Sequence, residues 1–200
     1  MKIQFAGLAL LLAMPGVVAG QMRMGASATS YGVSVRTANL NQTAASATLP
    51  GDGSLAQAQA SNVTLGSYVS AQDVFAVATG DGDDPADAGS SVTLESVSVL
   101  NGLITADGVV AIASSSAEGS NGDGSSLANV TVNGVSLGDA VAPNTRVELP
   151  GVGYVVLNEQ TTTPGGITVN MIHVVLQQSV LGVTRTTGEI VVGSASSSVN

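Results

Sequence analysis

Two Asn-Gly pairs, at Asn101-Gly102 and at Asn133-Gly134, constrain the fold of this chain more than any other feature of its sequence. This dipeptide favours the two-residue type I′ turn, which joins neighbouring antiparallel strands into a hairpin. In the register that each turn sets, apolar residues fall on one face of the hairpin and polar residues on the other. The predicted apolar pairs are Val99 with Ile104, Val97 with Ala106, Val132 with Val135, and Val130 with Leu137. Both segments are therefore predicted to be β-hairpins with one buried face.

The strand that leads into the first hairpin contains a change of phase. Its apolar alternation ends at Leu94 and starts again, shifted by one position, at Val97. One extra residue near Glu95-Ser96 restores a common apolar face, and such an insertion is a β-bulge. The sequence therefore predicts a bulge within this strand.

The rest of the chain also has the character of strands. Valine and threonine are abundant, 25 glycines supply turns, and no segment after residue 20 has apolar residues at helical spacing. Further strands are predicted at 33–35, 63–69, 74–78, 109–113, 147–149, 154–157, 167–176 and 190–192. We predict an all-β fold, an antiparallel β-sandwich of roughly nine to twelve strands. A β-solenoid is the alternative, because the chain is rich in small residues, although it has no fixed repeat.

The first residues have the pattern of a secretory signal peptide. Lys2 supplies a positive charge, an apolar stretch follows to Val18, and small residues lead to a cleavage position after Ala19. Pro15 and Gly16 interrupt this stretch, which is too short to span a membrane comfortably. We therefore predict a signal peptide at 1–19, a single all-β domain at 20–200, and a secreted, extracellular or cell-surface location. The absence of Cys favours a bacterial over a eukaryotic exported protein.

Composition excludes several classes of function. The chain has 14 acidic and 5 basic side chains, a net charge of −9, and aromatic residues make up only 2% of it. An acidic surface with few aromatic rings repels nucleic-acid backbones and offers few platforms for bases. Without Cys the chain has neither disulfides nor thiolate metal ligands. We therefore expect no nucleic-acid partner and no transmembrane segment in the mature chain.

The only histidine, His173, lies in a predicted strand. Alternation places it on the face of Val169, Met171 and Val175. No Gly-x-Ser-x-Gly motif is present, and a serine hydrolase needs a nucleophile and a carboxylate beside the imidazole. We predict a structural histidine, hydrogen-bonded in or near the core, and a protein that is not an enzyme.

An acidic loop is the best candidate for a metal site. Asp81, Asp83, Asp84 and Asp87 lie within seven residues, and carboxylate oxygens at this density can bind Ca²⁺. The EF-hand pattern fails, because Val92 stands where a bidentate Glu is needed. The loop is therefore predicted to be a solvated turn without a cofactor, and a structural Ca²⁺ is the alternative. The polar loop at 118–124 is a weaker candidate.

Three glutamates allow a further hypothesis. Glu148, Glu159 and Glu189 lie at or near predicted strand ends, where a pair of carboxylates could catalyse glycoside hydrolysis. Tyr154 is the only aromatic residue nearby, whereas carbohydrate enzymes usually present aromatic platforms. A hydrolase that depends on Asp or Glu is therefore the last of our alternatives.

Five segments in the second half of the chain share the pattern of a known family. They are LITADGVVAIASSSA (103–117), ANVTVNGVSL (128–137), PNTRVELPGVGYVVLNEQ (143–160), ITVNMIHVVL (167–176) and GEIVVGSASSSV (188–199). On these segments, of which 143–160 is the most specific, the chain resembles the choice-of-anchor P family of bacterial exported proteins. The resemblance implies an exported surface or extracellular protein whose relatives carry different C-terminal attachment signals. It implies no catalytic residues.

The end of the chain differs from that family pattern. It has no LPxTG-like motif, no apolar terminal helix and no basic tail after the last predicted strand. We therefore expect release to the medium or non-covalent retention at the surface.

These features together predict a non-enzymatic, exported structural or interaction protein that is surface-associated or secreted. The first alternative is an extracellular module that binds polysaccharide or peptide through loops at one end of the sandwich. The sequence does not identify the partner. A cell-envelope polymer and a second copy of the chain, paired through edge strands, are the candidates.

Overall fold

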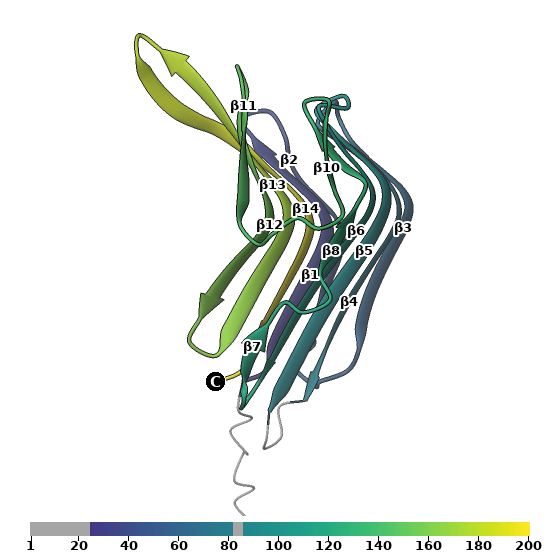
Figure 1. Ribbon diagram of the computed structural model, residues 1–200. Helices are drawn as coiled ribbons and strands as arrows, with labels where there is room; N and C mark the ends of the chain where they lie inside the picture. The colour runs from purple at the N-terminus through teal and green to yellow at the C-terminus, as the bar shows by residue number, and fades with distance from the viewer. Residues whose placement is uncertain (1–24, 82–85) are drawn as a thin grey trace, which may run out of the picture.

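The computed structural model describes residues 25–81 and 86–200, and these residues form two antiparallel sheets packed face to face (Figure 1). The six-stranded sheet has the order β11 (Thr145–Leu149), β12 (Gly153–Thr163), β13 (Gly166–Val180), β14 (Val183–Ser198), β1 (Ser27–Thr37) and β2 (Asn41–Thr48). The eight-stranded sheet has the order β10 (Val135–Gly138), β9 (Val130–Val132), β6 (Ile104–Ser116), β5 (Asp87–Val99), β4 (Val69–Asp81) and β3 (Ala56–Leu65). Its remaining strands, β7 (Gly119–Asn121) and β8 (Ser126–Ala128), pair with β6.

The predicted all-β sandwich is confirmed. The described residues contain fourteen strands rather than nine to twelve, because β7, β8 and β9 are only three residues long. No helix occurs in the described part of the chain, so no helix there could cross a membrane. The predicted signal peptide at 1–19 lies outside the described residues.

Both Asn-Gly turns are where the sequence predicts them. Asn101 and Gly102 have φ angles of 55° and 87°, and Asn133 and Gly134 have φ angles of 50° and 75°. Two consecutive positive values are the signature of a type I′ turn. The register of the first hairpin is confirmed, with Val99 opposite Ile104 and Val97 opposite Ala106.

In the second hairpin one predicted pair is wrong. Val132 lies opposite Val135, but Val130 lies opposite Gly138 rather than Leu137. The register shifts after Ser136, so Leu137 is an extra residue on its strand. Leu137 is 37% exposed as a result, whereas Val135, although paired as predicted, is 61% exposed on the edge strand β10.

The strand predicted at 63–69 is also wrong. The chain turns there, and Leu65 at the end of β3 lies opposite Val69 at the start of β4. Gly66 has a φ angle of 57°, and the amide of Tyr68 donates to the carbonyl of Leu65 at 3.1 Å. Val63, Leu65 and Val69 keep an apparent alternation through the turn, which conceals it in the sequence.

A transverse line of irregular residues crosses the six-stranded sheet at mid-length, and we call it the crease. On five of the six strands, β11 excepted, the residues on either side of this line are paired with the neighbouring strand, whereas the residue on the line is not. These residues are Ala45 on β2, Gly32 on β1, Gly193 on β14, Met171 on β13 and Asn158 on β12. Ala45, Gly193 and Asn158 have φ angles of 52°, 67° and 50°. Because such a residue interrupts the alternation of side chains, the inward-facing pattern of each strand shifts by one position at the crease.

The eight-stranded sheet has a matching crease. Its residues are Ser61 on β3, Asp73 on β4, Ser96 on β5 and Asp107 on β6. Asp73 and Ser96 have φ angles of 46° and 48°, and the register between β4 and β5 shifts at this level. The bulge predicted near Glu95-Ser96 is therefore confirmed, and it is one member of a line that crosses the four long strands of the sheet.

The two creases coincide with a bend of the sandwich. Figure 1 shows both layers bending at mid-length, with the six-stranded sheet on the inner side of the bend. In both sheets the crease residues point towards the outer side. A Cβ added at Gly32 or Gly193 would meet Val74 or Val109 of the opposite sheet, whereas Asp73 is exposed to solvent.

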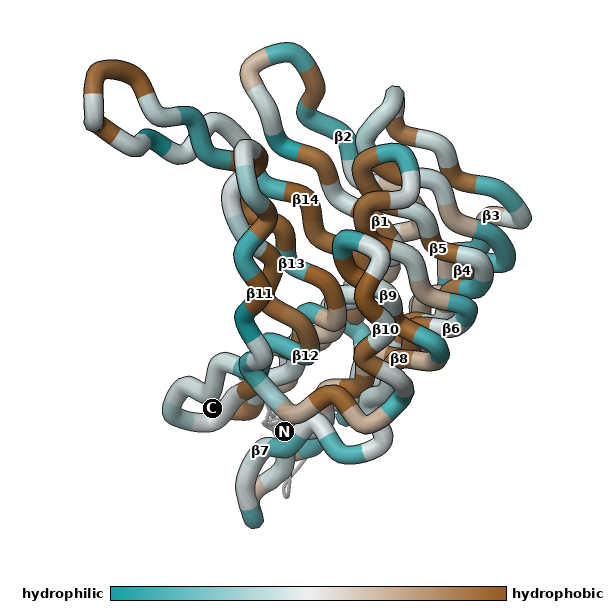
Figure 2. Tube along the Cα trace, turned by 45° about the horizontal axis from the view of Figure 1, so that its top comes forward, coloured by the Kyte–Doolittle hydropathy of each residue, from teal (hydrophilic) through white to brown (hydrophobic). Residues whose placement is uncertain are grey.

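The core between the sheets is built almost entirely from aliphatic side chains. The largest fully buried residues are Leu, Ile, Val and Met, and the cluster of fully buried core residues contains no aromatic ring. The β13–β14 hairpin extends beyond this core. Its tip is apolar and exposed (Figure 2), with Val180, Leu181 and Val183 at 57%, 100% and 55% exposure.

Candidate functional site: the outer face of the six-stranded sheet

The outer face of the six-stranded sheet carries two rows of polar side chains that cross five strands. In each row, the register places every residue opposite the next one. The first row consists of Thr161, Thr168, Ser196, Thr29 and Thr48. The second row consists of Glu159, Asn170, Ser194, Tyr31 and Ser46. We call these two rows the polar face.

The alternation of each strand explains why these side chains face outward. Residues of the two rows alternate with buried residues such as Val169 on β13 and Ala195 on β14, which point into the core. Neighbouring strands lie about 4.8 Å apart, so each row is a line of polar groups at nearly even spacing. Within the first row, the hydroxyls of Thr168 and Ser196 form a hydrogen bond at 2.9 Å.

A hydrogen-bond network fixes the second row. The Nδ1–H of His173 donates to Oε2 of Glu159 at 2.9 Å, and Nδ2 of Asn170 donates to the same oxygen at 2.8 Å. The hydroxyl of Ser194 donates to Oδ1 of Asn170 at 2.8 Å. These contacts join β12, β13 and β14. Since the partners hold one another in place, the side chains are already ordered without a ligand.

The network couples two charges. The hydrogen bond from His173 lowers the pKa of Glu159 below its ordinary value of 4.5, although burial opposes this, and the Asn170 hydrogen bond and the imidazolium charge add to the lowering. The hydrogen bond to Glu159 raises the pKa of His173 above 6.5 against burial, with help from the charges of Glu159 and Glu189. Both shifts favour the ion pair.

The imidazole of His173 is not placed where the alternation predicts. It shares the outer face with Val175, as expected, but Val169 and Met171 face the core, so that part of the prediction is wrong. The crease at Met171 shifts the phase between them. The imidazole is hydrogen-bonded, and its Nε2 is buried without a partner among the described residues. Within residues 25–81 and 86–200, therefore, no hydroxyl forms a hydrogen bond with this nitrogen.

The other predicted glutamates lie on the same face but do not join the network. Glu148 accepts a hydrogen bond from Nε of Arg146 at 2.8 Å, and the Arg146 guanidinium lies 3.6 Å from the ring centroid of Tyr154. Glu189 is partly buried on β14 and acts on His173 through its charge alone. The sheet thus brings Glu159 and His173 into contact and leaves Glu148 with its own partner.

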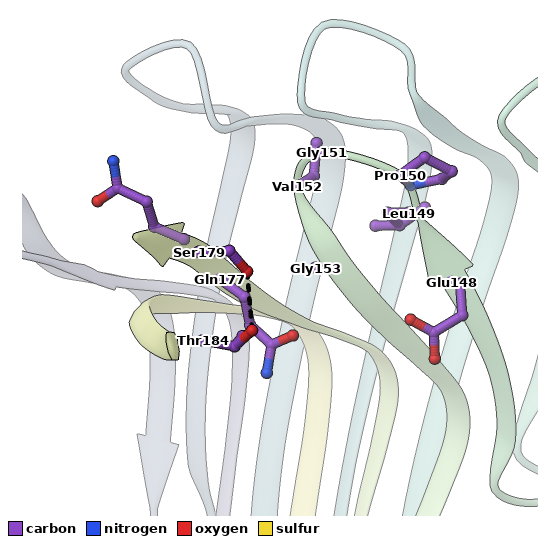
Figure 3. A pocket seen from close by; sticks show the side chains of 10 residues that line it. Glu148, Leu149, Pro150, Gly151, Val152, Gly153, Gln177, Ser179 and Thr184 are labelled. Carbon is purple, nitrogen blue, oxygen red and sulfur yellow. Dashed lines mark hydrogen bonds between the residues drawn. The ribbon is translucent and has the colours of Figure 1, made fainter. Parts of the chain in front are cut away.

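A shallow hollow of about 490 Å³ lies at one end of this sheet (Figure 3). Figure 3 shows the β11–β12 turn with Pro150 on one side and the part of the β13–β14 hairpin next to its tip, with Ser179 and Thr184, on the other. The hydroxyls of Ser179 and Thr184 form a hydrogen bond at 2.7 Å. The only charged residue that lines the hollow is Glu148, so no acid–base pair converges there.

The predicted acidic loop is only partly described. Asp83 and Asp84 lie outside the described residues. Asp81 and Asp87 end the paired part of the β4–β5 hairpin, and Oδ1 of Asp87 accepts a hydrogen bond from the amide of Asp81 at 3.1 Å. Within the described ranges no group of three His, Asp or Glu side chains could hold a metal ion.

The polar face itself was not predicted. Asn170 and His173 are three residues apart, which in a regular strand places them on opposite faces. The crease between them removes one step of alternation and brings both to the outer face. The repeated Ser and Thr residues of β1, β12, β13 and β14 were a usable signal, but only the register shows that they align. No family model, curated protein or solved structure matches this chain.

Proposed function

We propose that this protein is an exported, non-enzymatic interaction module of the choice-of-anchor P type, and that its polar face holds a neutral extracellular polysaccharide. The observation that supports this proposal is the alignment of hydroxyl side chains across five strands in the row from Thr161 to Thr48. Hydroxyl groups both donate and accept hydrogen bonds, as sugar hydroxyls do. A polymer lying across the strands therefore meets a hydroxyl at each strand.

The charges of the face favour a neutral polymer. The two rows contain one carboxylate, Glu159, and His173, whose pKa is raised by this contact, balances its charge when protonated. No Lys or Arg lies in either row, and the whole chain carries a net charge of −9. An anionic polymer would thus meet overall repulsion without a Lys or Arg within the rows to offset it.

The geometry also favours binding over catalysis. The face is an open sheet surface on the inner side of the bend (Figure 1), and an extended chain can lie along it. The ordered network around Asn170 supports tight contacts, because little side-chain entropy remains to be lost on binding.

Removal of the hydroxyl row tests the binding proposal. Val replaces Thr with nearly the same shape but without a hydroxyl, so the triple variant Thr29→Val, Thr161→Val, Thr168→Val keeps the sheet surface. The matched control, Thr93→Val, Thr105→Val, Thr131→Val, makes the same change on the outer face of the eight-stranded sheet. Retention on insoluble cellulose, chitin and starch is measured for each, with an anionic polysaccharide for contrast.

We expect the wild type and the control to be retained on at least one neutral polymer, and the polar-face variant to lose most of that retention. Each lost hydrogen bond is worth about 1 kcal/mol, so three together reduce affinity by roughly a hundredfold. Equal retention of both variants, or retention only on the anionic polymer, would contradict the proposal.

Export is tested separately. Fractionation of the native cells, followed by N-terminal sequencing, should find the mature protein in the medium or at the surface, beginning at Gly20. A protein that keeps residues 1–19 inside the cell would contradict export but would not bear on polysaccharide binding.

A further inference from the structure

One lateral edge of the sandwich is unprotected. It is formed by β2 (Asn41–Thr48) and β3 (Ala56–Leu65), which contact each other across the two layers, and we call it the open edge. In the described part of the chain β2 pairs only with β1, and β3 only with β4. Neither strand contains a charged residue or a proline. Monomeric β-proteins normally block such edges with charges, prolines or short strands, because free N–H and C=O groups recruit another strand.

The opposite edge has these protections. The strand β11 there exposes Arg146 and Glu148, and Pro143 and Pro150 lie on either side of it. In the other layer the edge strand β10 is only four residues long. Pairing of the open edge with the opposite edge of another copy, which would produce an endless polymer, is therefore disfavoured.

The crease restricts how β3 can pair with a copy of itself. An antiparallel pair requires opposed residues to face the same side of the sheet. Because the inward pattern shifts at Ser61, this condition holds along the whole strand only when the pair is centred between Ser61 and Asn62. Inward residues then oppose inward residues and exposed residues oppose exposed ones: Ala60 with Val63, Ala58 with Leu65, and Gln59 with Thr64.

The same condition applies to β2. Its inward pattern shifts at Ala45, which packs against the core as Ala44 does, and a pair centred between Ala44 and Ala45 matches Thr43 with Ser46 and Asn41 with Thr48. Both edge strands thus have their centre of pairing at the crease. A two-fold axis through the creases would exchange the two arms of the bend and keep the six-stranded sheet on its inner side (Figure 1).

Charge favours contact at this edge as well. Between Arg36 and Asp73 the sequence contains a single Asp, Glu, Lys or Arg residue, Asp52. Two copies of a chain with a net charge of −9 repel each other least where they meet at this nearly neutral edge.

We propose that the protein is a two-fold dimer in which β2 and β3 each pair antiparallel with the same strand of a second copy, so that both sheets continue across the interface. The open edges of two copies complete each other, and the protected opposite edges end the assembly at two. The dimer does not depend on polysaccharide binding, because the polar face remains uncovered on the inner side of each bend.

The oligomeric state is the first test. Light scattering on the wild type should give twice the mass of one chain. The variant Gln59→Lys, Thr64→Lys places Lys opposite Lys at each end of the predicted β3 pair and should be monomeric, since like charges directly opposed destabilise a strand pair. The control Thr93→Lys, Ser98→Lys, with the same change of charge on the outer face of the same sheet, should remain a dimer.

A cysteine introduced near the axis is the second test, and the absence of native Cys makes it specific. In the predicted register the two copies of residue 61 have Cα atoms about 6 Å apart, within disulfide range. Ser61→Cys should therefore form a covalent dimer on mild oxidation. Gln57→Cys is an exposed control on the same strand whose copies lie about 30 Å apart, and it should not.

The proposal would be overturned by a monomeric wild type, by a dimer that persists in Gln59→Lys, Thr64→Lys, or by equal cross-linking of the two cysteine variants. An open-ended polymer would also overturn it, because the protected edge is expected to stop growth.

Discussion

The two sheets bend at the same level but use different residues to do so. In the six-stranded sheet, Gly32 and Gly193 lie at the crease and face the core. In the eight-stranded sheet, Asp73 and Ser96 take the equivalent positions and are exposed. At these positions the bend is formed by glycine in the six-stranded sheet and by polar residues in the eight-stranded sheet.

The direction of the bend explains this difference. Crease residues of both sheets point to its outer side, which for the six-stranded sheet is the packed core and for the eight-stranded sheet is solvent. At Gly32 and Gly193 in the first layer volume therefore selects the residue, because a side chain there would collide with Val74 or Val109 of the opposite sheet, whereas the core accommodates Met171 on the same crease. In the eight-stranded sheet the crease residue must instead tolerate a positive φ angle, and short polar residues such as Asp and Ser are acceptable there.

The largest expected effect comes from filling the core side of the crease. In Gly193→Ala the new Cβ would lie 2.6 Å from Cγ1 of Val109, at a φ angle of 67°. Overpacking and the left-handed backbone together should lower the free energy of unfolding by about 3 kcal/mol, measured by urea denaturation. The control Gly102→Ala has a φ angle of 87° and no atom near its Cβ, and should lose only about 1 kcal/mol. Equal losses would show that volume does not distinguish the sites.

Gly32→Ala should have a smaller effect, because this residue does not have a positive φ angle. The new Cβ would collide with Val74 of the opposite sheet, and we expect a loss of about 2 kcal/mol. Shortening the neighbour in Gly32→Ala, Val74→Ala should recover part of it, so a double-mutant cycle should give a favourable coupling energy. Additive effects would mean that the two sites do not touch.

At the solvent-exposed crease of the eight-stranded sheet, a substitution should raise the free energy of unfolding instead of lowering it. Ser96 has a φ angle of 48°, and Ser96→Gly removes the steric cost of that conformation without opening a cavity. We expect a gain in stability of about 1 kcal/mol in the same urea assay. Ser98→Gly, two residues further along the same strand, should instead lose about 1 kcal/mol because its backbone is regular. A loss in both variants would contradict the assignment of backbone tolerance to this crease.

The smallest effect concerns an ion pair that only the six-stranded sheet has at its crease. Because the pKa of His173 is raised in the folded protein, its ionisation adds to the free energy of unfolding. This stabilisation is complete below pH 6.5 and is lost as the pH rises through the raised pKa. Because the pKa of Glu159 is lowered in the folded protein, its ionisation also stabilises the fold. This stabilisation is complete above pH 4.5 and is lost as the pH falls through the lowered pKa. The stability difference between wild type and His173→Gln should thus be largest between pH 4.5 and 6.5, at most about 1 kcal/mol. A difference that is constant from pH 4 to 8, measured by thermal melting, would exclude this pair as its source.

Local patterns predicted the fold well. The Asn-Gly turns, the first hairpin register and the bulge at Ser96 all depend on neighbouring residues, and all are confirmed. The errors arise where a local pattern continues through a change of direction, as at Gly66, or through an irregular pair, as at Leu137. In both cases the apolar residues keep an alternating spacing in the sequence, although the backbone turns or shifts its register there.

The polar face was beyond sequence reasoning for a different reason. Its rows join residues from opposite ends of the chain, such as Thr29 and Ser196, which become neighbours only through the pairing of β1 with β14. The crease then moves His173 to the face of Asn170. A single phase shift was visible at Ser96, but its alignment with shifts on the other strands depends on the three-dimensional register.

The pairing of β1 with β14 has a mechanical consequence. Ser27 at the start of β1 lies opposite Ser198 at the end of β14, so the two ends of the described sandwich leave it side by side (Figure 2). A pulling force applied between them would act across the strands, along the inter-strand hydrogen bonds. The bonds would then break one after another, as in a zipper, rather than resist together in shear. A tether at both ends would therefore yield at low force, whereas a tether at one end would leave the sandwich without load.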